Sequence, residues 1–183
     1  METVAFKITG ASPLLMNNPV AMLEPSTTTI TKAIREYPKE EEAKKRLYKD
    51  EKGFYIQSVS FRSAILTATS GKKIGKEKAI FVIPSAVQLA EEKAYLVDSK
   101  DKLIKKYDID SRRVVVPSTK AGVIRHRPRF EEWNCYLLFK IDLDRIGAED
   151  VLLLLNDAGE KIGVGDFRPN KKGWFGLFKA ELK

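Results

Sequence analysis

Arginines are concentrated in one segment of the chain, where they could bind a phosphate backbone. No acidic residue stands between Asp110 and Glu131. The basic residues of this interval are Arg112, Arg113, Lys120, Arg125, Arg127 and Arg129. Arginine suits such a contact because its planar guanidinium can grip phosphate through two N–H groups and can also stack on bases. The segment therefore predicts contact with a polyanion.

Three of these arginines alternate along the chain. If residues 125–129 are extended, Arg125, Arg127 and Arg129 share one side and form a cationic row whose spacing resembles that of phosphates. The alternative is a row of arginines that pair with surface carboxylates, which would add little to binding. The sequence leaves both interpretations open.

Two shorter segments combine basic residues with glycines. The first holds Lys72, Lys73 and Lys76, and the second, residues 163–176, holds Arg168, Lys171 and Lys172. The glycines of the second segment are Gly163, Gly165, Gly173 and Gly176. Glycines let a backbone run close to a phosphate, and a Walker loop is excluded because no Gly-Lys-Ser/Thr ending is present. The basic loops could converge on one groove, although Trp174 and Phe175 also fit a tight hairpin with both rings in the core.

His126 is the only histidine, and it lies among the arginines. A histidine can serve as general acid or base in metal-independent RNA cleavage, but one histidine supplies only one proton-transfer group. We therefore expect no catalytic residue and assign His126 to nucleic-acid contact, with a metal-independent endoribonuclease as the alternative. We also expect neither metal nor cofactor, because no carboxylate or Cys/His cluster has suitable spacing and Cys135 is the only cysteine.

The strands that position these residues follow from the hydrophobic pattern. Residues 4–8 and 133–143 alternate, which predicts strands with one buried face, and weaker patterns predict strands over 80–90 and 175–182. Pro84 interrupts the weaker pattern over 80–90. The buried face of the clearest strand comprises Trp133, Cys135, Leu137, Phe139, Ile141 and Leu143.

Helical periodicity separates these strands. Ser60 can cap a helix that ends near Gly71, with a buried face of Phe61, Ala64, Ile65 and Ala68. Acidic residues open a second helix from Ala148 to Lys161, and Gly163 follows it. Its buried stripe comprises Val151, Leu154, Leu155 and Ala158. A charged helix over 39–45 enters through Pro38.

The order strand, helix, strand, strand, helix, strand predicts an α+β, ferredoxin-like (RRM-like) βαββαβ core. We expect one domain over 1–183, with an inserted excursion at about 17–52, a basic insertion at about 91–130 and a charged loop or hairpin over 91–110. RRM-type proteins lay bases across the open face of such a sheet, so Tyr136 and Lys140 on that side are further candidate contacts. The alternative for both is ordinary surface.

Composition agrees with a folded domain that meets a polyanion. The chain has 183 residues with 33 Lys and Arg against 25 Asp and Glu, a net charge of +8 and a pI near 9.4. A solvated, lysine-rich surface like that of heat-adapted proteins is the alternative. No apolar run approaches the ~20 residues of a membrane span. We expect a cytoplasmic protein with no membrane partner.

Three segments resemble the RAMP superfamily of CRISPR-associated proteins. Residues 8–15 resemble its opening strand and Pro-Leu turn, 55–65 its helix entry and 163–178 its glycine-rich loop and last strand, although Gln57 and Ser63 replace the family's frequent Pro and Gly. The resemblance is strongest to backbone subunits that coat guide RNA in Cascade-like effector complexes, and it extends to relatives in phages or mobile elements. It implies a ferredoxin-like palm with thumb and web insertions, stacked head to tail along RNA, with phosphate contacts by Arg62 and Arg168.

Together these observations predict a protein, not an enzyme, that binds single-stranded RNA, or single-stranded DNA, with little sequence preference. Its expected partners are that strand, copies of itself along the strand and other effector subunits. A structural, oligomerising protein without selective RNA binding is a further alternative, which copurified nucleic acid would distinguish.

Overall fold

The computed structural model describes residues 1–22, 38–115, 120 and 122–183. Its strands are β1 (Glu2–Gly10), β2 (Leu14–Leu15), β3 (Tyr55–Gln57), β4 (Lys73–Ile74), β5 (Glu77–Lys78), β6 (Val87–Leu89), β7 (Lys93–Tyr95), β8 (Asp108–Val115), β9 (Gly122–Phe130), β10 (Asn134–Ile141) and β11 (Phe178–Leu182). Its helices are α1 (Lys39–Lys45), α2 (Ser58–Ala68), α3 (Ala79–Ala86) and α4 (Ala148–Lys161), with 3-10 turns η1 (Pro19–Met22) and η2 (Pro169–Lys171).

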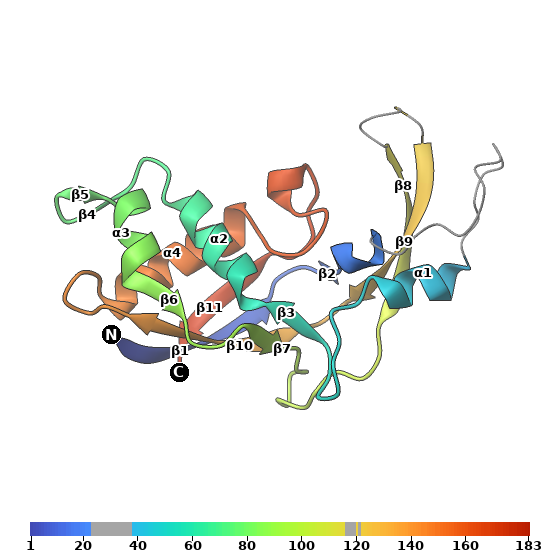
Figure 1. The fold of residues 1–183 in the computed structure, drawn as a ribbon, viewed down its shortest axis with the longest axis horizontal. Coiled ribbons are helices and arrows are strands. Elements are labelled where there is room, and N and C mark those ends of the chain that lie inside the picture. The colour runs from blue at the N-terminus through green and yellow to red at the C-terminus, as the bar shows by residue number, and fades with distance from the viewer. Residues whose placement is uncertain (23–37, 116–119, 121) are drawn as a thin grey trace.

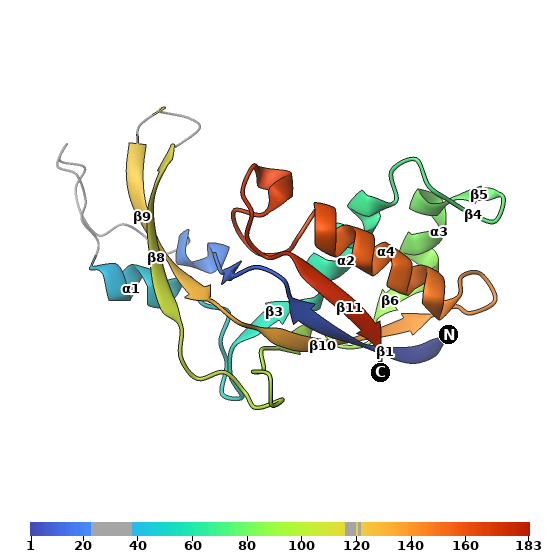
Figure 2. The ribbon, with the colours of Figure 1, turned by 180° about the vertical axis from the view of Figure 1, so that it is seen from behind.

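The main sheet has the strand order β11–β1–β10–β6, and every neighbouring pair is antiparallel. With α2 between β1 and β6 and α4 between β10 and β11, this is the order of a ferredoxin-like core. Helices α2, α3 and α4 cover one face of the sheet, and the other face is open (Figures 1 and 2). The predicted α+β fold class is confirmed.

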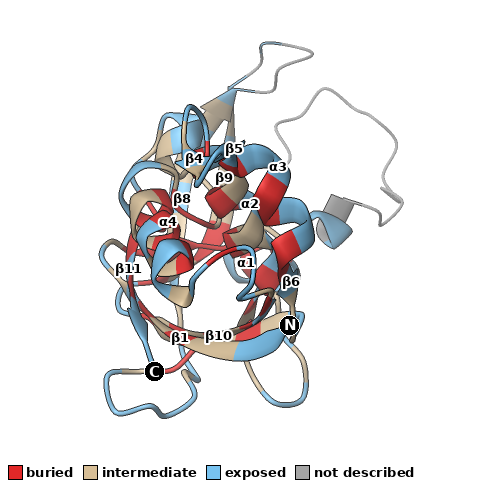
Figure 3. Cartoon of the chain, turned by 90° about the vertical axis from the view of Figure 1, so that its left-hand side faces the viewer, coloured by how far each residue is buried: buried red, intermediate tan, exposed pale blue. Residues whose placement is uncertain are grey.

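The core lies between that sheet and its helices (Figure 3). Every second residue of β10 is buried, and so are the predicted faces of α2 and α4. These faces were predictable from the sequence because apolar residues recur every second residue along a strand with one buried face, and with a period of 3.6 residues along a helix that covers it.

The predicted strand over 80–90 is wrong for most of its length. Ala79–Ala86 is a helix, and only Val87–Leu89 pairs with β10. The buried residues of α3 follow helical spacing, namely Ala79, Val82, Ile83 and Ala86. Pro84 is exposed and sits in the last turn, where it removes only one helical hydrogen bond.

Four other boundaries differ from the sequence predictions. Helix α2 begins at Ser58 after Gln57, so Ser60 is not its cap, and β11 begins at Phe178 instead of residue 175. Leu143 lies beyond β10 and is 41% exposed. The predicted charged loop over 91–110 contains β7, whose pairing with β3 buries Ala94.

Strands β8 and β9 form an antiparallel ribbon that projects away from the main sheet (Figure 1). At its base β9 pairs with β2, and α1 packs against β9. The helix predicted over 39–45 is present as α1, whereas residues 23–37 of the predicted excursion lie outside the described residues. In the described ranges, every helix falls short of the length and apolarity that a membrane span requires.

Candidate nucleic-acid interface

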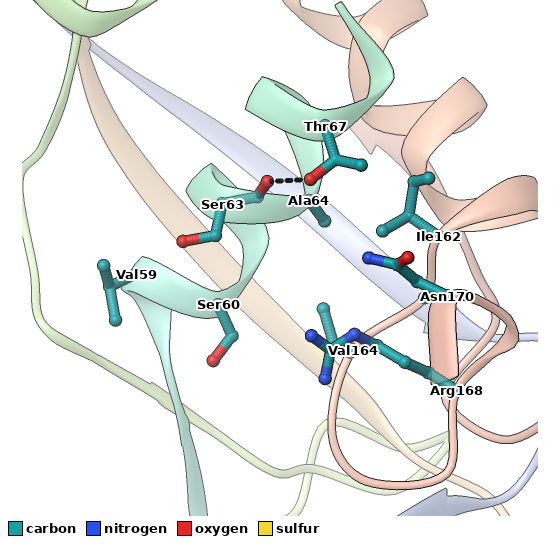
Figure 4. A pocket seen from close by; sticks show the side chains of 10 residues that line it. Val59, Ser60, Ser63, Ala64, Thr67, Ile162, Val164, Arg168 and Asn170 are labelled. Atoms are coloured by element: carbon teal, nitrogen blue, oxygen red, sulfur yellow. Dashed lines mark hydrogen bonds between the residues drawn. The ribbon is translucent and has the colours of Figure 1, made fainter. Parts of the chain in front are cut away.

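A cleft of about 200 Å³ separates α2 from residues 163–176, which we call the glycine loop. We call it the α2 cleft. The helix contributes polar side chains to its lining, and the loop contributes a guanidinium and an amide: Ser60, Ser63, Thr67, Arg168 and Asn170. Figure 4 shows the Arg168 and Asn170 side chains extending from the loop toward α2. The Thr67 hydroxyl already donates to the carbonyl of Ser63 at 3.0 Å, so the donors that the two elements offer in the cleft come from Ser60, Ser63, Arg168 and Asn170.

The glycine loop is folded back on itself, and its glycines make that possible. Gly176 has a φ of +70°, and a Cβ there would lie 1.8 Å from the carbonyl oxygen of Val164. A hydrogen bond of 2.9 Å from Val164 N to Gly176 O closes the loop. Gly165 and Gly173 also lie too close to neighbouring atoms for a Cβ, and Gly163 has a φ of +69°. These contacts explain the glycines by internal packing, without reference to a phosphate.

The basic residues of the glycine loop face the α2 cleft or solvent. Arg168 lines the cleft and donates from Nη1 to the carbonyl of Gly165 at 2.7 Å, which uses one of its five N–H groups. Lys171 and Lys172 are exposed at η2. Trp174 is 53% exposed and Phe175 is fully buried, so only one of the two rings is part of the core.

The ribbon arginines have carboxylate partners. Residues 122–130 form β9, so the condition under which the three arginines share a side is met. Each guanidinium nevertheless lies close to a carboxylate oxygen: Arg125 Nη1 is 3.3 Å from Glu42 Oε1, Arg127 Nε is 2.6 Å from Asp166 Oδ2, and Arg129 Nη2 is 2.5 Å from Glu131 Oε2. Arg127 is only 7% exposed. The arrangement matches the carboxylate-paired alternative, and a phosphate-binding role for this row stays a prediction.

Glu42 of α1 is the carboxylate that joins the excursion to the ribbon. It is buried, and besides Arg125 it accepts hydrogen bonds from Arg46 and from the backbone N–H of His126. The Glu42 carboxylate can be buried because hydrogen bonds from these three residues compensate its charge. Sequence analysis did not identify Glu42, since nothing along the chain shows that the 39–45 helix lies against β9.

Arg112 and Arg113 have opposite environments on neighbouring positions of β8. Arg112 pairs with Asp110 at 2.5 Å and packs over the rings of Phe167 and Phe175, so it fastens the glycine loop to the ribbon. Arg113 is exposed, as is Lys120. Of the two arginines, Arg113 is the one free to meet a solvent-borne ligand.

His126 lies on the face of the ribbon opposite Arg125, Arg127 and Arg129, because successive residues of a strand point to opposite faces. Nδ1 of His126 is 2.7 Å from Oγ of Ser111, its cross-strand neighbour. Glu42 contacts the backbone of His126 and not its ring. Among the described residues, no group of His, Cys, Asp and Glu could hold a metal ion.

The other predicted contacts are dispersed. Arg62 donates to the carbonyls of Val87 at 2.9 Å and Pro84 at 2.8 Å, and so holds α2 against α3 and β6. Lys72 pairs with Asp157, while Lys73 and Lys76 are exposed. The hairpin of these lysines and the β8–β9 ribbon lie at opposite ends of the molecule (Figures 1 and 2). The three basic segments therefore do not converge on one groove.

The open face of the sheet carries Tyr136 and Lys140, as predicted. The hydroxyl of Tyr136 donates to Asp101 at 2.7 Å, and Lys183 lies 4.1 Å above its ring. Lys140 is exposed. A stacked base would have to displace Lys183, so this face is a weaker candidate than the α2 cleft.

The residues that sequence analysis missed are the polar residues of the cleft, Ser60, Ser63, Thr67 and Asn170. The spacing of the first three along the outer face of a helix was a usable signal, since a helical serine or threonine that avoids the core faces solvent or a ligand. Nothing in the sequence placed that face opposite Asn170.

No family model and no curated protein matches the chain. Among solved structures, the chain is similar to Cmr6 from Pyrococcus furiosus, with a TM-score of 0.51 and 13% sequence identity. The match covers 98% of each chain. At this identity the likeness shows the shared fold alone.

Proposed function

We propose that this protein binds single-stranded RNA in the α2 cleft, as a RAMP-like subunit that coats a guide strand. The observation that carries the proposal is the position of Arg168 and Asn170 opposite the hydroxyls of Ser60 and Ser63. Guanidinium, amide and hydroxyl groups are the donors that proteins direct at phosphate oxygens. Such contacts position a strand without reading its sequence.

The charge of the glycine loop supports this proposal. The glycine loop contains three basic residues and one acidic residue, Asp166, whereas Arg62 of α2 is bound to the carbonyls of Val87 and Pro84. The Asp166 carboxylate is paired with Arg127 of the ribbon. The remaining charge attracts a polyanion, and release of condensed counterions would drive its binding.

The sequence resemblance to the RAMP superfamily supports the RNA-binding class, and the fold shared with Cmr6 over nearly the whole chain is compatible with it. The α2 entry and the glycine loop are two of the three segments that carry the resemblance. The backbone role and the association of several copies along one strand rest on the sequence resemblance.

We expect wild-type protein to bind poly-U and mixed-sequence single-stranded RNA with similar affinity, because phosphate contacts carry no sequence information. Fluorescence anisotropy measures the affinity, and light scattering with a long strand measures the number of protomers, which should exceed one. Tight binding confined to a single duplex sequence would exclude the proposal. A strict one-to-one complex on every length would exclude the coating role.

We further propose that the protein has no ribonuclease activity. His126 is hydrogen-bonded to a serine, and its ring has no carboxylate contact among the described residues, so the imidazole lacks the orienting acid of a typical general base.

His126→Ala is therefore expected to leave the rate of RNA cleavage unchanged. Gel analysis of labelled RNA incubated with each protein in chelator measures that rate. Cleavage by wild type that disappears in the variant would establish the endoribonuclease alternative.

A further inference from the structure

A second cleft, of about 150 Å³, lies beside the α2 cleft, and Ser60 lines both. We call it the Tyr48 cleft. It is enclosed by the β2 segment, the residues before α2 and the beginning of the glycine loop. An RNA strand that follows the α2 cleft past Ser60 therefore passes the opening of the Tyr48 cleft.

The floor of the Tyr48 cleft is apolar and one wall is aromatic. Leu14, Met16 and Ile56 contribute to its lining, and their exposed fractions are 0%, 2% and 5%. Tyr48 is half-buried, and its ring centroid lies 5.9 Å from that of Tyr55 at an interplanar angle of 49°. The cleft thus offers an apolar floor and a supported aromatic ring to a flat, unsaturated group.

Two polar groups line the same cleft. Oδ1 of Asn17 accepts a hydrogen bond from Nη1 of Arg46, which leaves the Nδ2 group as the donor end of that amide. Asp166 accepts the N–H of Phe167 at Oδ1. Its Oδ2 is buried and ion-paired with Nε of Arg127 at 2.6 Å, whereas Oδ1 keeps a second lone pair for another donor. A donor and an acceptor are thus available beside the apolar floor.

The wall formed by the glycine loop depends on Gly165. Its φ is +77°, and a Cβ would lie 2.6 Å from the carbonyl oxygen of Leu15 and 2.7 Å from Cδ1 of Leu14. The loop can close against the β2 segment only without a side chain at this position. A hydrogen bond of 2.9 Å from Asp166 N to Leu15 O fixes the closed arrangement.

We propose that the Tyr48 cleft receives one nucleobase of the strand whose phosphates lie in the α2 cleft. The inference rests on the proposed RNA binding and deepens it. A nucleobase has two apolar faces and an edge of donors and acceptors, which match the Tyr48 ring, the apolar floor and the Asn17 and Asp166 groups. The Tyr48 cleft adjoins the α2 cleft at Ser60, and this favours a nucleobase as its occupant. An unrelated small molecule would need no phosphate site beside it.

The experiment compares a single-stranded RNA oligomer with an abasic oligomer of the same length, which keeps every phosphate and lacks the bases. Wild-type protein is expected to bind the RNA about 10-fold more tightly than the abasic strand, because stacking on an aromatic ring is lost with the base. In Tyr48→Ala this ratio should fall to near one, and in Tyr48→Phe it should be kept. Tyr95→Ala is the matched control, since Tyr95 is also half-buried and its ring meets that of Tyr55 edge-on at a centroid distance of 5.9 Å, but it does not line the cleft.

The outcomes separate this inference from the proposed function. If both strands bind wild type and Tyr48→Ala leaves the ratio unchanged, the base pocket is refuted while phosphate binding stands. An equal loss of the ratio in Tyr95→Ala would also refute it, because the effect would not belong to the cleft. If neither strand binds wild type, the proposed function itself fails. Thermal melting of each variant confirms that the comparison concerns folded protein.

Discussion

We expect the simultaneous replacement of Arg168, Lys171 and Lys172 by Ala to make RNA binding less dependent on salt. The slope of log affinity against log salt should become less steep by about 2. Each phosphate contact on a single strand contributes about 0.7 to the slope of log affinity against log salt, and three contacts are removed. If the lines for wild type and variant meet at about 1 M salt, affinity at about 0.1 M falls roughly 100-fold. Anisotropy titrations at four or more salt concentrations measure both quantities.

The β4–β5 hairpin supplies a matched control. Lys73, Lys76 and Lys78 are exposed, and their replacement by Ala removes the same charge at the end of the molecule opposite the ribbon. We expect this control to change the slope by less than about 0.7, one contact. An unchanged slope in the folded glycine-loop variant, with a flattened slope in the control, would move the binding surface to the lysine hairpin.

Asp166→Ala is expected to destabilise the protein by about 3–5 kcal/mol, because it removes the carboxylate that compensates a buried guanidinium. Burial lowers the pKa of Arg127, and among the charges that raise this pKa again the carboxylate of Asp166 has the largest effect. For a domain of this size the loss corresponds to a melting temperature lower by about 10 °C. Differential scanning calorimetry measures the change.

Glu131→Ala is the control for this second prediction. It removes the partner of Arg129, but the side chains of that pair are 32% and 60% exposed. Water screens the remaining charge, so the cost should stay below about 1 kcal/mol. Equal melting temperatures for Asp166→Ala and wild type would show that the Arg127 pair does not fasten the glycine loop to the ribbon.

The glycine-loop variant and Asp166→Ala also distinguish the roles of two arginines that the sequence alone could not distinguish. Arg127 and Arg168 both lie in basic segments, and both are plausible phosphate contacts by residue type. In the structure Arg127 holds two elements together, whereas Arg168 lines a cleft. We therefore expect the first to affect mainly stability and the second mainly binding.

The sequence by itself determined the regular core. Strands β1 and β10, the buried faces of α2 and α4 and the order of elements were all readable, because one-sided burial imposes a period on the chain. Helix α3 was misassigned as a strand, since eight residues with a proline are too few for periodicity to distinguish the two. Its actual spacing of buried residues was nonetheless present in the sequence.

Only the tertiary structure decided which basic residues could meet a ligand. The sequence indicated that Arg125, Arg127 and Arg129 share a side if their segment is extended, and β9 is extended. Their carboxylate partners come in part from distant segments, with Glu42 83 positions away from Arg125. Likewise, Ser60 and Arg168 line one cleft because α2 and the glycine loop pack as neighbours. Charge and residue type are local properties, whereas pairing and burial depend on long-range packing, which no local pattern encodes.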